Sequence, residues 1–163
     1  MADTPIGEHT SVERIEPGDK PGELIVTWED GASSRIDLNG LIARDPELAA
    51  LEKPEVFAAV VAADWGWGAE WPGGLSCSAK VLSRLARDQH DWGTADYTRW
   101  QDDLGLSNQQ AADVLGVTTR TIEYYRSGKP LSRTVQIACM AIRDDPAYLD
   151  AFYRARKPGR PSR

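Results

Sequence analysis

The residue types best suited to binding chemistry lie between residues 107 and 129, where polar, basic and aromatic side chains recur at helical spacing. Arg120 can donate two hydrogen bonds to the edge of a guanine, and Thr119 can contact a thymine methyl group or a phosphate. Tyr124 can pack on a sugar and bond a phosphate, while Glu123 can accept from cytosine or orient Arg120. The stretch therefore predicts contact with DNA. The candidate contact residues are Ser107, Gln109, Thr118, Thr119, Arg120, Glu123, Tyr124, Arg126, Lys129 and Arg133.

Two short helices are expected to position these side chains. A capping box of the form S-x-x-Q starts at Ser107 and begins the first helix, and Thr118 can cap the second. Between them, Ala112, Gly116 and Ile122 follow the spacing A-x3-G-x5-I. Ala112 is small enough for the second helix to cross over it, Gly116 accepts the positive φ of a tight turn, and Ile122 fills the core.

Three further helices are expected around this pair. One lies between Thr94, which can act as its N-cap, and Gly105; another begins at Ser132; the last begins at the Asp145-Pro146 pair. Their apolar residues recur at the spacing of one helix face. The residues expected to form the apolar faces of the five helices are Tyr97, Trp100, Leu104, Ala111, Ala112, Leu115, Ile122, Tyr125, Val135, Ala138, Cys139, Ile142, Leu149, Phe152 and Tyr153. The second half of the chain is thus predicted to be an all-α bundle of five helices.

The sequence WQDDLGLSNQQAADVLGVTTRTIEYYRSGKP resembles the helix-turn-helix family of phage-repressor type, often called the Xre family. The resemblance covers residues 95 to 143. It implies a lambda-repressor-like bundle in which the third helix enters the major groove and the start of the second lies against phosphate.

Phosphate contacts are expected from Ser107 and Gln109, at the positive end of a helix dipole, and from the charges of Arg126, Lys129 and Arg133. The helix-turn-helix domain has little net positive charge for a DNA-binding domain, and a dimer would double its basic contacts. A homodimer over an inverted repeat is therefore expected. The alternative is a helical bundle whose exposed polar face is only solvated.

The end of the chain, RKPGRPSR, resembles a degenerate AT-hook, in which Gly-Arg-Pro lies in the minor groove of A·T-rich DNA. Pro158 stands where that motif usually has a basic residue. A solubilising terminus that adds attraction to phosphate is the alternative. The candidate minor-groove or phosphate residues are Arg156, Lys157, Arg160 and Arg163.

The first half of the chain has the signals of a small α+β domain, an antiparallel sheet with a helix. Two β-rich runs flank the turn dipeptide Asp30-Gly31, an apolar strand is expected over 57–64, and Ser78 can cap a helix. The runs LIVTWEDGASSRIDL and ADWGWGAEWPGGLSCSAKVL resemble the DUF2442 family of small bacterial domains, over residues 10 to 86. The family name carries no biochemical activity. The expected organisation is a tail at 1–9, this domain at 10–88, a linker at 89–94, the helix-turn-helix domain at 95–153 and a basic tail at 154–163.

Three tryptophans close together are the unusual feature of the first half. Trp65 and Trp67 alternate with glycines, which would place both on one strand face as an aromatic platform for a ligand. The alternative is that they and Trp71 fill the core or a subunit interface. The acidic residues of this half, including Glu23, Glu29, Asp30 and Asp37, are expected to form a solvated face that keeps it away from DNA.

Charge is distributed unevenly along the 163 residues, whose net charge is −6. Up to His90 the chain has 8 basic and 16 acidic residues, and after it 11 basic and 9 acidic. The acidic total therefore excludes a uniformly basic coat without excluding DNA binding. Cys77 and Cys139 lack metal-type spacing and are expected to be reduced and buried. With no apolar run long enough for a membrane span and no signal-peptide pattern at the start, a cytoplasmic location is expected.

Catalytic patterns are not found in the sequence. His9 and His90 lie in the expected tail and linker, away from a plausible nucleophile, and no metalloprotease or nucleophile-elbow motif occurs. No enzyme and no cofactor or metal is expected. The leading hypothesis is a bacterial transcriptional regulator that binds double-stranded DNA, with the first domain dimerising, sensing or recruiting. The alternative is an antitoxin-like protein whose first domain binds a protein partner and whose DNA binding is autoregulatory.

Overall fold

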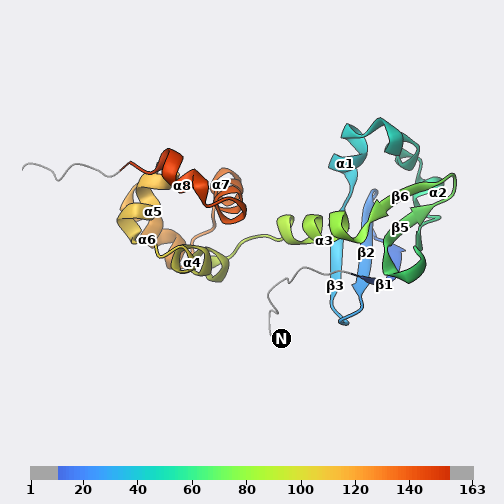
Figure 1. The fold of residues 1–163 in the computed structure, drawn as a ribbon, viewed down its shortest axis with the longest axis horizontal. Helices are drawn as coiled ribbons and strands as arrows, with labels where there is room; N and C mark the ends of the chain where they lie inside the picture. The colour runs from blue at the N-terminus through green and yellow to red at the C-terminus, as the bar shows by residue number, and fades with distance from the viewer. Residues whose placement is uncertain (1–10, 155–163) are drawn as a thin grey trace, which may run out of the picture. The chain divides into compact units, whose positions relative to one another are not determined.

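A computed structural model describes residues 11–154 of the chain, which divides after His90 into two compact units (Figure 1). The protein is mixed α+β, with two small antiparallel sheets in the first unit and helices in both. Within the described residues, no helix combines the length and apolarity that crossing a membrane requires.

The first sheet has the order β1-β2-β3, from strands β1 (Val12–Pro17), β2 (Glu23–Trp28) and β3 (Ser33–Asp37). The turn at Asp30-Gly31 joins the second and third strands, so the predicted hairpin is confirmed. Leu24, Val26 and Trp28 alternate along β2 and are almost fully buried, which is the two-residue period of a strand packed on a core. This face supplies the centre of the first unit.

The apolar strand expected over 57–64 is wrong. After α1 (Asn39–Arg44) and the 3-10 segment η1 (Pro46–Glu52), the chain forms the helical turn α2 (Pro54–Phe57), and only β4 (Val61–Ala62) is extended. Pro54 occupies the first helical position, where its fixed φ is favourable, and Ala58 bonds back to its carbonyl. A continuous apolar run lacks the alternation that distinguishes a strand from a buried helical turn.

The second sheet has the order β4-β5-β6 and leads into a helix. Strands β5 (Gly68–Trp71) and β6 (Leu75–Ser78) pair antiparallel, and α3 (Ala79–Asp88) follows. The predicted cap is confirmed, since the Ser78 hydroxyl accepts a hydrogen bond from the Val81 amide at 3.3 Å. Leu82 is fully buried in the same core as the first sheet, so one core serves both sheets.

The residue after α3 is anchored to the first sheet. The Gln89 carboxamide accepts from the Asp37 amide at 2.8 Å and donates to the Asp37 carbonyl at 2.7 Å. The expected linker at 89–94 therefore includes a residue fastened to β3, and its other end, Thr94, is already helical. Glu23 also differs from the expected solvated face, because it is 9% exposed and pairs with Arg35 at 3.1 Å.

The second unit contains α4 (Thr94–Asp103), α5 (Asn108–Leu115), α6 (Thr119–Arg126), α7 (Arg133–Asp144) and α8 (Ala147–Phe152). The predicted inward residues largely form its core. Buried together are Tyr97, Trp100, Ala111, Ala112, Ile122, Tyr125, Val135, Cys139 and Ile142, while Leu104, Leu115 and Leu149 are half-buried against them.

Two details of these helices differ from expectation. Thr94 is the first helical residue rather than the cap, because Asp96 accepts the Gly93 amide at 2.9 Å and fixes the turn one residue earlier. Phe152 is 61% exposed and stacks on the exposed Tyr148 one turn earlier, whereas Leu149 packs against the core.

Both cysteines are free and buried, as predicted. Burial raises the pKa of Cys77 to about 11, offset slightly by Arg84, and burial raises the pKa of Cys139 to about 12. Burial also raises the pKa of Tyr97. These groups stay protonated, and the thiols are unreactive, near neutral pH.

Candidate nucleic-acid interface

The α5 and α6 pair has the local geometry that its sequence predicts. The Ser107 hydroxyl accepts the Gln110 amide at 3.2 Å, and the Gln110 side chain accepts the Ser107 amide at 2.9 Å, so the capping box is confirmed. Gly116 ends α5 at φ 67°, a left-handed conformation that costs a residue with a side chain about 1–2 kcal/mol. The turn is therefore fixed at both ends by local chemistry.

Helix α6 then presents one buried and one exposed face. Thr118 caps it through the Thr121 amide at 3.2 Å, while Ile122 and Tyr125 are buried. On the opposite face, Arg120 and Glu123 are exposed, and Tyr124 is 38% exposed. Thr119 is only half-buried rather than fully outward.

Two cations gather on the ring of Tyr124. Arg120 Nε donates to the Tyr124 hydroxyl at 2.6 Å, and its guanidinium carbon lies 5.4 Å from the ring centroid. Lys129 Nζ lies 5.1 Å from the same centroid, and its amide bonds the Tyr124 carbonyl at 3.0 Å. We call these three residues the Tyr124 cluster. The structure thus orients Arg120 through Tyr124, whereas the sequence suggested Glu123 for that role.

The remaining candidate contact residues differ in whether their side chains already have a partner within the protein. Arg126 forms an ion pair with Asp102 of α4 at 3.1 Å, a contact between residues distant in sequence. Gln109 donates to Asp113 one turn along α5 at 3.0 Å. Arg133 is exposed at the first position of α7. The four candidates of the basic tail, Arg156, Lys157, Arg160 and Arg163, lie outside the described residues.

A buried glutamine that sequence reasoning missed positions the start of α5. Gln101 is 2% exposed, and its Nε2 donates to the Leu106 carbonyl at 3.0 Å and to Asn108 Oδ1 at 2.9 Å. It lies one helical turn after Tyr97, on the face that packs against the core. A polar residue on an apolar helix face was the available signal.

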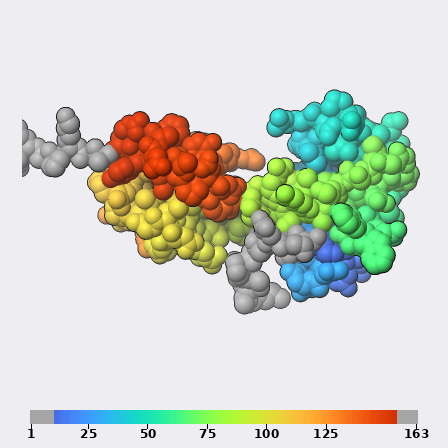
Figure 2. All heavy atoms as spheres, viewed as in Figure 1, coloured from blue at the N-terminus to red at the C-terminus, as the bar shows by residue number. Residues whose placement is uncertain are grey.

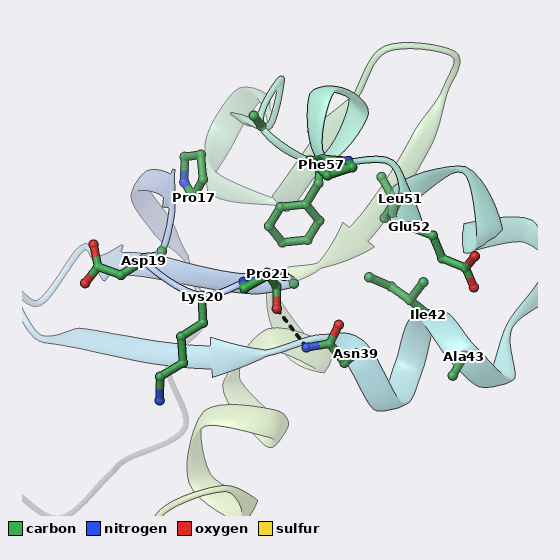
Figure 3. A pocket seen from close by; sticks show the side chains of 14 residues that line it. Pro17, Asp19, Lys20, Pro21, Asn39, Ile42, Ala43, Leu51, Glu52 and Phe57 are labelled. Atoms are coloured by element: carbon green, nitrogen blue, oxygen red, sulfur yellow. Dashed lines mark hydrogen bonds between the residues drawn. The ribbon is translucent and has the colours of Figure 1, made fainter.

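The first unit holds a pocket of about 510 Å³ between the β1-β2 turn and the segment from α1 to α2 (Figure 3). Its lining combines the apolar Ile42, Leu51 and Phe57 with the charged Asp19, Lys20 and Glu52. Asp19 and Glu52 lie at opposite ends of the pocket in Figure 3. The Asn39 side chain bonds the Pro21 carbonyl at 2.8 Å and holds the turn in place. The cavity is large enough for a small molecule.

Trp65 and Trp67 do not share a strand face, and Trp71 is separate from both. Trp71 is buried and donates to the Phe57 carbonyl at 2.9 Å, so it belongs to the core. Trp65 lies in the 3-10 turn η2 (Asp64–Gly66), and Trp67 follows it before β5 begins. A turn replaces the predicted alternation because Trp65 adopts φ 60°. The two residues are 91% and 73% exposed.

Over residues 11–154, no group of three or more histidine, cysteine or acidic side chains could hold a metal ion. No family model matches the chain, and neither does any curated protein sequence. A solved structure that resembles it is that of a candidate DNA-binding protein from Nitrosomonas europaea. The two are 27% identical, the match covers 82% of this chain and 86% of that one, and the TM-score is 0.42.

Proposed function

We propose that this protein is a sequence-specific DNA-binding protein that regulates transcription through the α5-turn-α6 motif. The observation that carries the proposal is the Tyr124 cluster, which gathers two cations on the exposed side of a helix whose other side is buried. Arg120 reads a guanine edge in the major groove, and Tyr124 holds its guanidinium in place. The resemblance to the Xre family agrees with this assignment.

Phosphate contacts surround this reading helix. The amides at the start of α5, capped by Ser107, face phosphate at the positive end of the helix dipole, with Gln109 beside them. Lys129 and Arg133 add positive charge, and Arg126 contributes when it exchanges Asp102 for a phosphate. Each neutralised phosphate makes binding more sensitive to salt.

The protein acts as a homodimer in this proposal. Ile137, Tyr148 and Phe152 are exposed apolar residues on α7 and α8, and the rings of Tyr148 and Phe152 stack 6.0 Å apart. Figure 2 shows α8 at the surface of the second unit. Burying this surface in a symmetric contact would duplicate the reading helix for an inverted repeat.

The first unit, which resembles DUF2442, serves dimerisation, sensing or partner binding rather than catalysis. Its pocket supports a sensing role, since a small effector could occupy it. A second candidate function is that of an antitoxin-like protein, with DNA binding used for autoregulation. The exposed tryptophans favour it, because large exposed aromatic residues commonly mark interaction surfaces.

The decisive experiment selects bound DNA from a random pool with the full chain and then measures affinity by fluorescence anisotropy. Arg120→Ala should weaken binding to the selected site about 5- to 160-fold, because a bidentate base contact contributes about 1–3 kcal/mol of discrimination. Lys129→Ala should instead lower the salt dependence of binding, with a slope reduced by about one.

Arg44→Ala is the matched control, since Arg44 is an exposed arginine at the end of α1 and should leave the affinity unchanged. A folded Arg120→Ala variant that binds the selected site as tightly as the unmodified protein would remove α6 from the reading role. Failure to enrich any sequence from the pool would reject sequence-specific binding.

A further inference from the structure

The tryptophan turn of the first unit, residues 64–67, presents two large aromatic side chains to solvent. Trp65 is 91% exposed and Trp67 is 73% exposed, whereas Trp28 and Trp71 of the same unit are 1% and 3% exposed. Exposed tryptophans of this kind are uncommon in a unit that already has a complete core. The green segment that contains the turn lies at the surface of this unit in Figure 2.

The backbone of this turn is held firmly. Trp65 is the one described non-glycine residue with positive φ, at φ 60° and ψ 19°, a conformation that is unfavourable for a bulky side chain. The Ala79 amide bonds the Trp67 carbonyl at 2.7 Å, and the Ala63 amide bonds the Gly68 carbonyl at 2.9 Å. A Cβ at Gly66 would collide with the Ser11 hydroxyl, so the turn packs directly on β1. Such strain persists where surrounding contacts impose it, and it concentrates at functional sites.

The charge around the turn is negative. Residues 54–79 contain Glu55, Asp64 and Glu70 and no lysine or arginine. Glu70 lies opposite the exposed Val61 in the β4-β5 register, which puts both on one face of the sheet. Neither Asp64 nor Glu70 forms an ion pair with another residue in the described range.

More acidic charge lies across β1. The Ser11 carbonyl accepts the Glu29 amide at 3.2 Å, while the Ser11 side chain packs on Gly66. The exposed Glu29 therefore lies close to the turn. Two basic residues flank residues 54–79 in sequence, Lys53 before α2 and Lys80 at the start of α3.

We propose that Trp65 and Trp67, together with Asp64 and Glu70, form a docking surface for an arginine- or lysine-rich segment of a partner protein. The indole faces attract cations, and tryptophan does so best among aromatic residues. The carboxylates select positive charge and repel nucleic acid. A second copy of this acidic unit would bring like charges together and does not fit this surface, whereas a basic segment does.

The test uses the full chain and a fluorescein-labelled peptide of alternating arginine and glycine, with binding followed by anisotropy. Trp65→Gly and Trp67→Ala should each weaken binding about two- to fivefold, the size of an exposed cation-π contact. Trp65→Gly is informative because glycine accepts the left-handed backbone at this position. The variant should therefore unfold at a temperature at least as high as the unmodified protein while binding the peptide less well.

One matched control accompanies these variants. Glu47→Gln removes an exposed carboxylate of η1 and should leave peptide affinity unchanged. Asp64→Asn should weaken it. A peptide with glutamate in place of arginine should not bind.

Three results would overturn the proposal. The first is that the unmodified protein does not measurably bind the arginine peptide, or that it binds with the same affinity when Trp65 and Trp67 are both replaced. The second is equal affinity for the glutamate peptide. The third is a shift from dimer to monomer in the double variant, measured by analytical ultracentrifugation, which would assign the tryptophans to a contact between copies of this chain.

Discussion

The hydroxyl of Tyr124 has a role that its ring cannot replace. It accepts from Arg120 Nε at 2.6 Å and so restricts a long side chain that would otherwise sample many rotamers. In the proposed DNA complex, this restriction would lower the entropy lost when the guanidinium engages a base.

Tyr124→Phe is therefore expected to weaken binding to the selected DNA about three- to tenfold, as loss of one hydrogen bond of about 0.5–1.5 kcal/mol implies. The thermal stability should hardly change, because the residue is at the surface. Titration of the selected DNA site checks the prediction, with Tyr153→Phe as the control, since Tyr153 at the end of α8 belongs neither to the Tyr124 cluster nor to the proposed dimer contact. Equal affinity in the two variants would contradict an orienting role for the hydroxyl.

At the scale of elements, the α5-α6 turn depends on one backbone conformation. Gly116 has φ 67°, and a Cβ added there would meet no atom within 4 Å. The cost of a side chain is therefore conformational alone, without a steric clash.

Gly116→Ala should lower the free energy of unfolding by about 1–2 kcal/mol. Gly40→Ala is the matched control because its Cβ would also meet open space, but Gly40 lies in α1 without positive φ. That substitution should raise stability by about 0.5–1 kcal/mol. Urea denaturation followed by circular dichroism measures both, and a shift of the same sign in the two variants would contradict the explanation.

Elements whose ends are defined by neighbouring residues could be predicted from the sequence. Ser78, Ser107 and Thr118 each cap a helix through an amide three residues later, as predicted. Ser132 caps the helix that was predicted to begin there. The inward face of α6 followed from helical spacing in the same way. These features need no knowledge of the rest of the chain.

Features that depend on distant residues could not be predicted. β4 is extended over two residues where it pairs with β5. Gly66, next to the left-handed Trp65, lies against Ser11, which is 55 residues earlier in the chain. Arg126 is engaged by Asp102, 24 residues away. In the candidate site, the helix and its exposed face were therefore predictable, whereas the partners of individual charged side chains were not.

For the whole molecule, the free energy of unfolding is expected to fall at alkaline pH. Cys77, Cys139 and Tyr97 are buried acids whose pKa values are raised on folding, to about 11 for Cys77 and about 12 for Cys139. The unfolded chain loses these protons first, so folding is progressively penalised as pH rises.

Stability should be constant with respect to these groups below about pH 8.5 and should then fall, each thiol contributing up to about 1.4 kcal/mol per pH unit until its folded pKa is reached. Urea unfolding between neutral pH and pH 10.5 gives the slope. Cys139→Ala should make that slope shallower, even though removing the buried sulfur lowers stability at neutral pH. An unchanged slope would show that Cys139 does not contribute to the loss.

Because each unit has one buried cysteine, the rate of thiol modification can measure local opening of each unit separately. A thiol reagent can react only when the surrounding core opens, and the chain has no third cysteine to obscure the signal. The rate at Cys77 reports opening of the first unit and the rate at Cys139 reports opening of the second. If added DNA slows modification at Cys139 alone, the DNA stabilises the helical unit. If a basic peptide slows modification at Cys77 alone, the peptide stabilises the unit that contains the sheets.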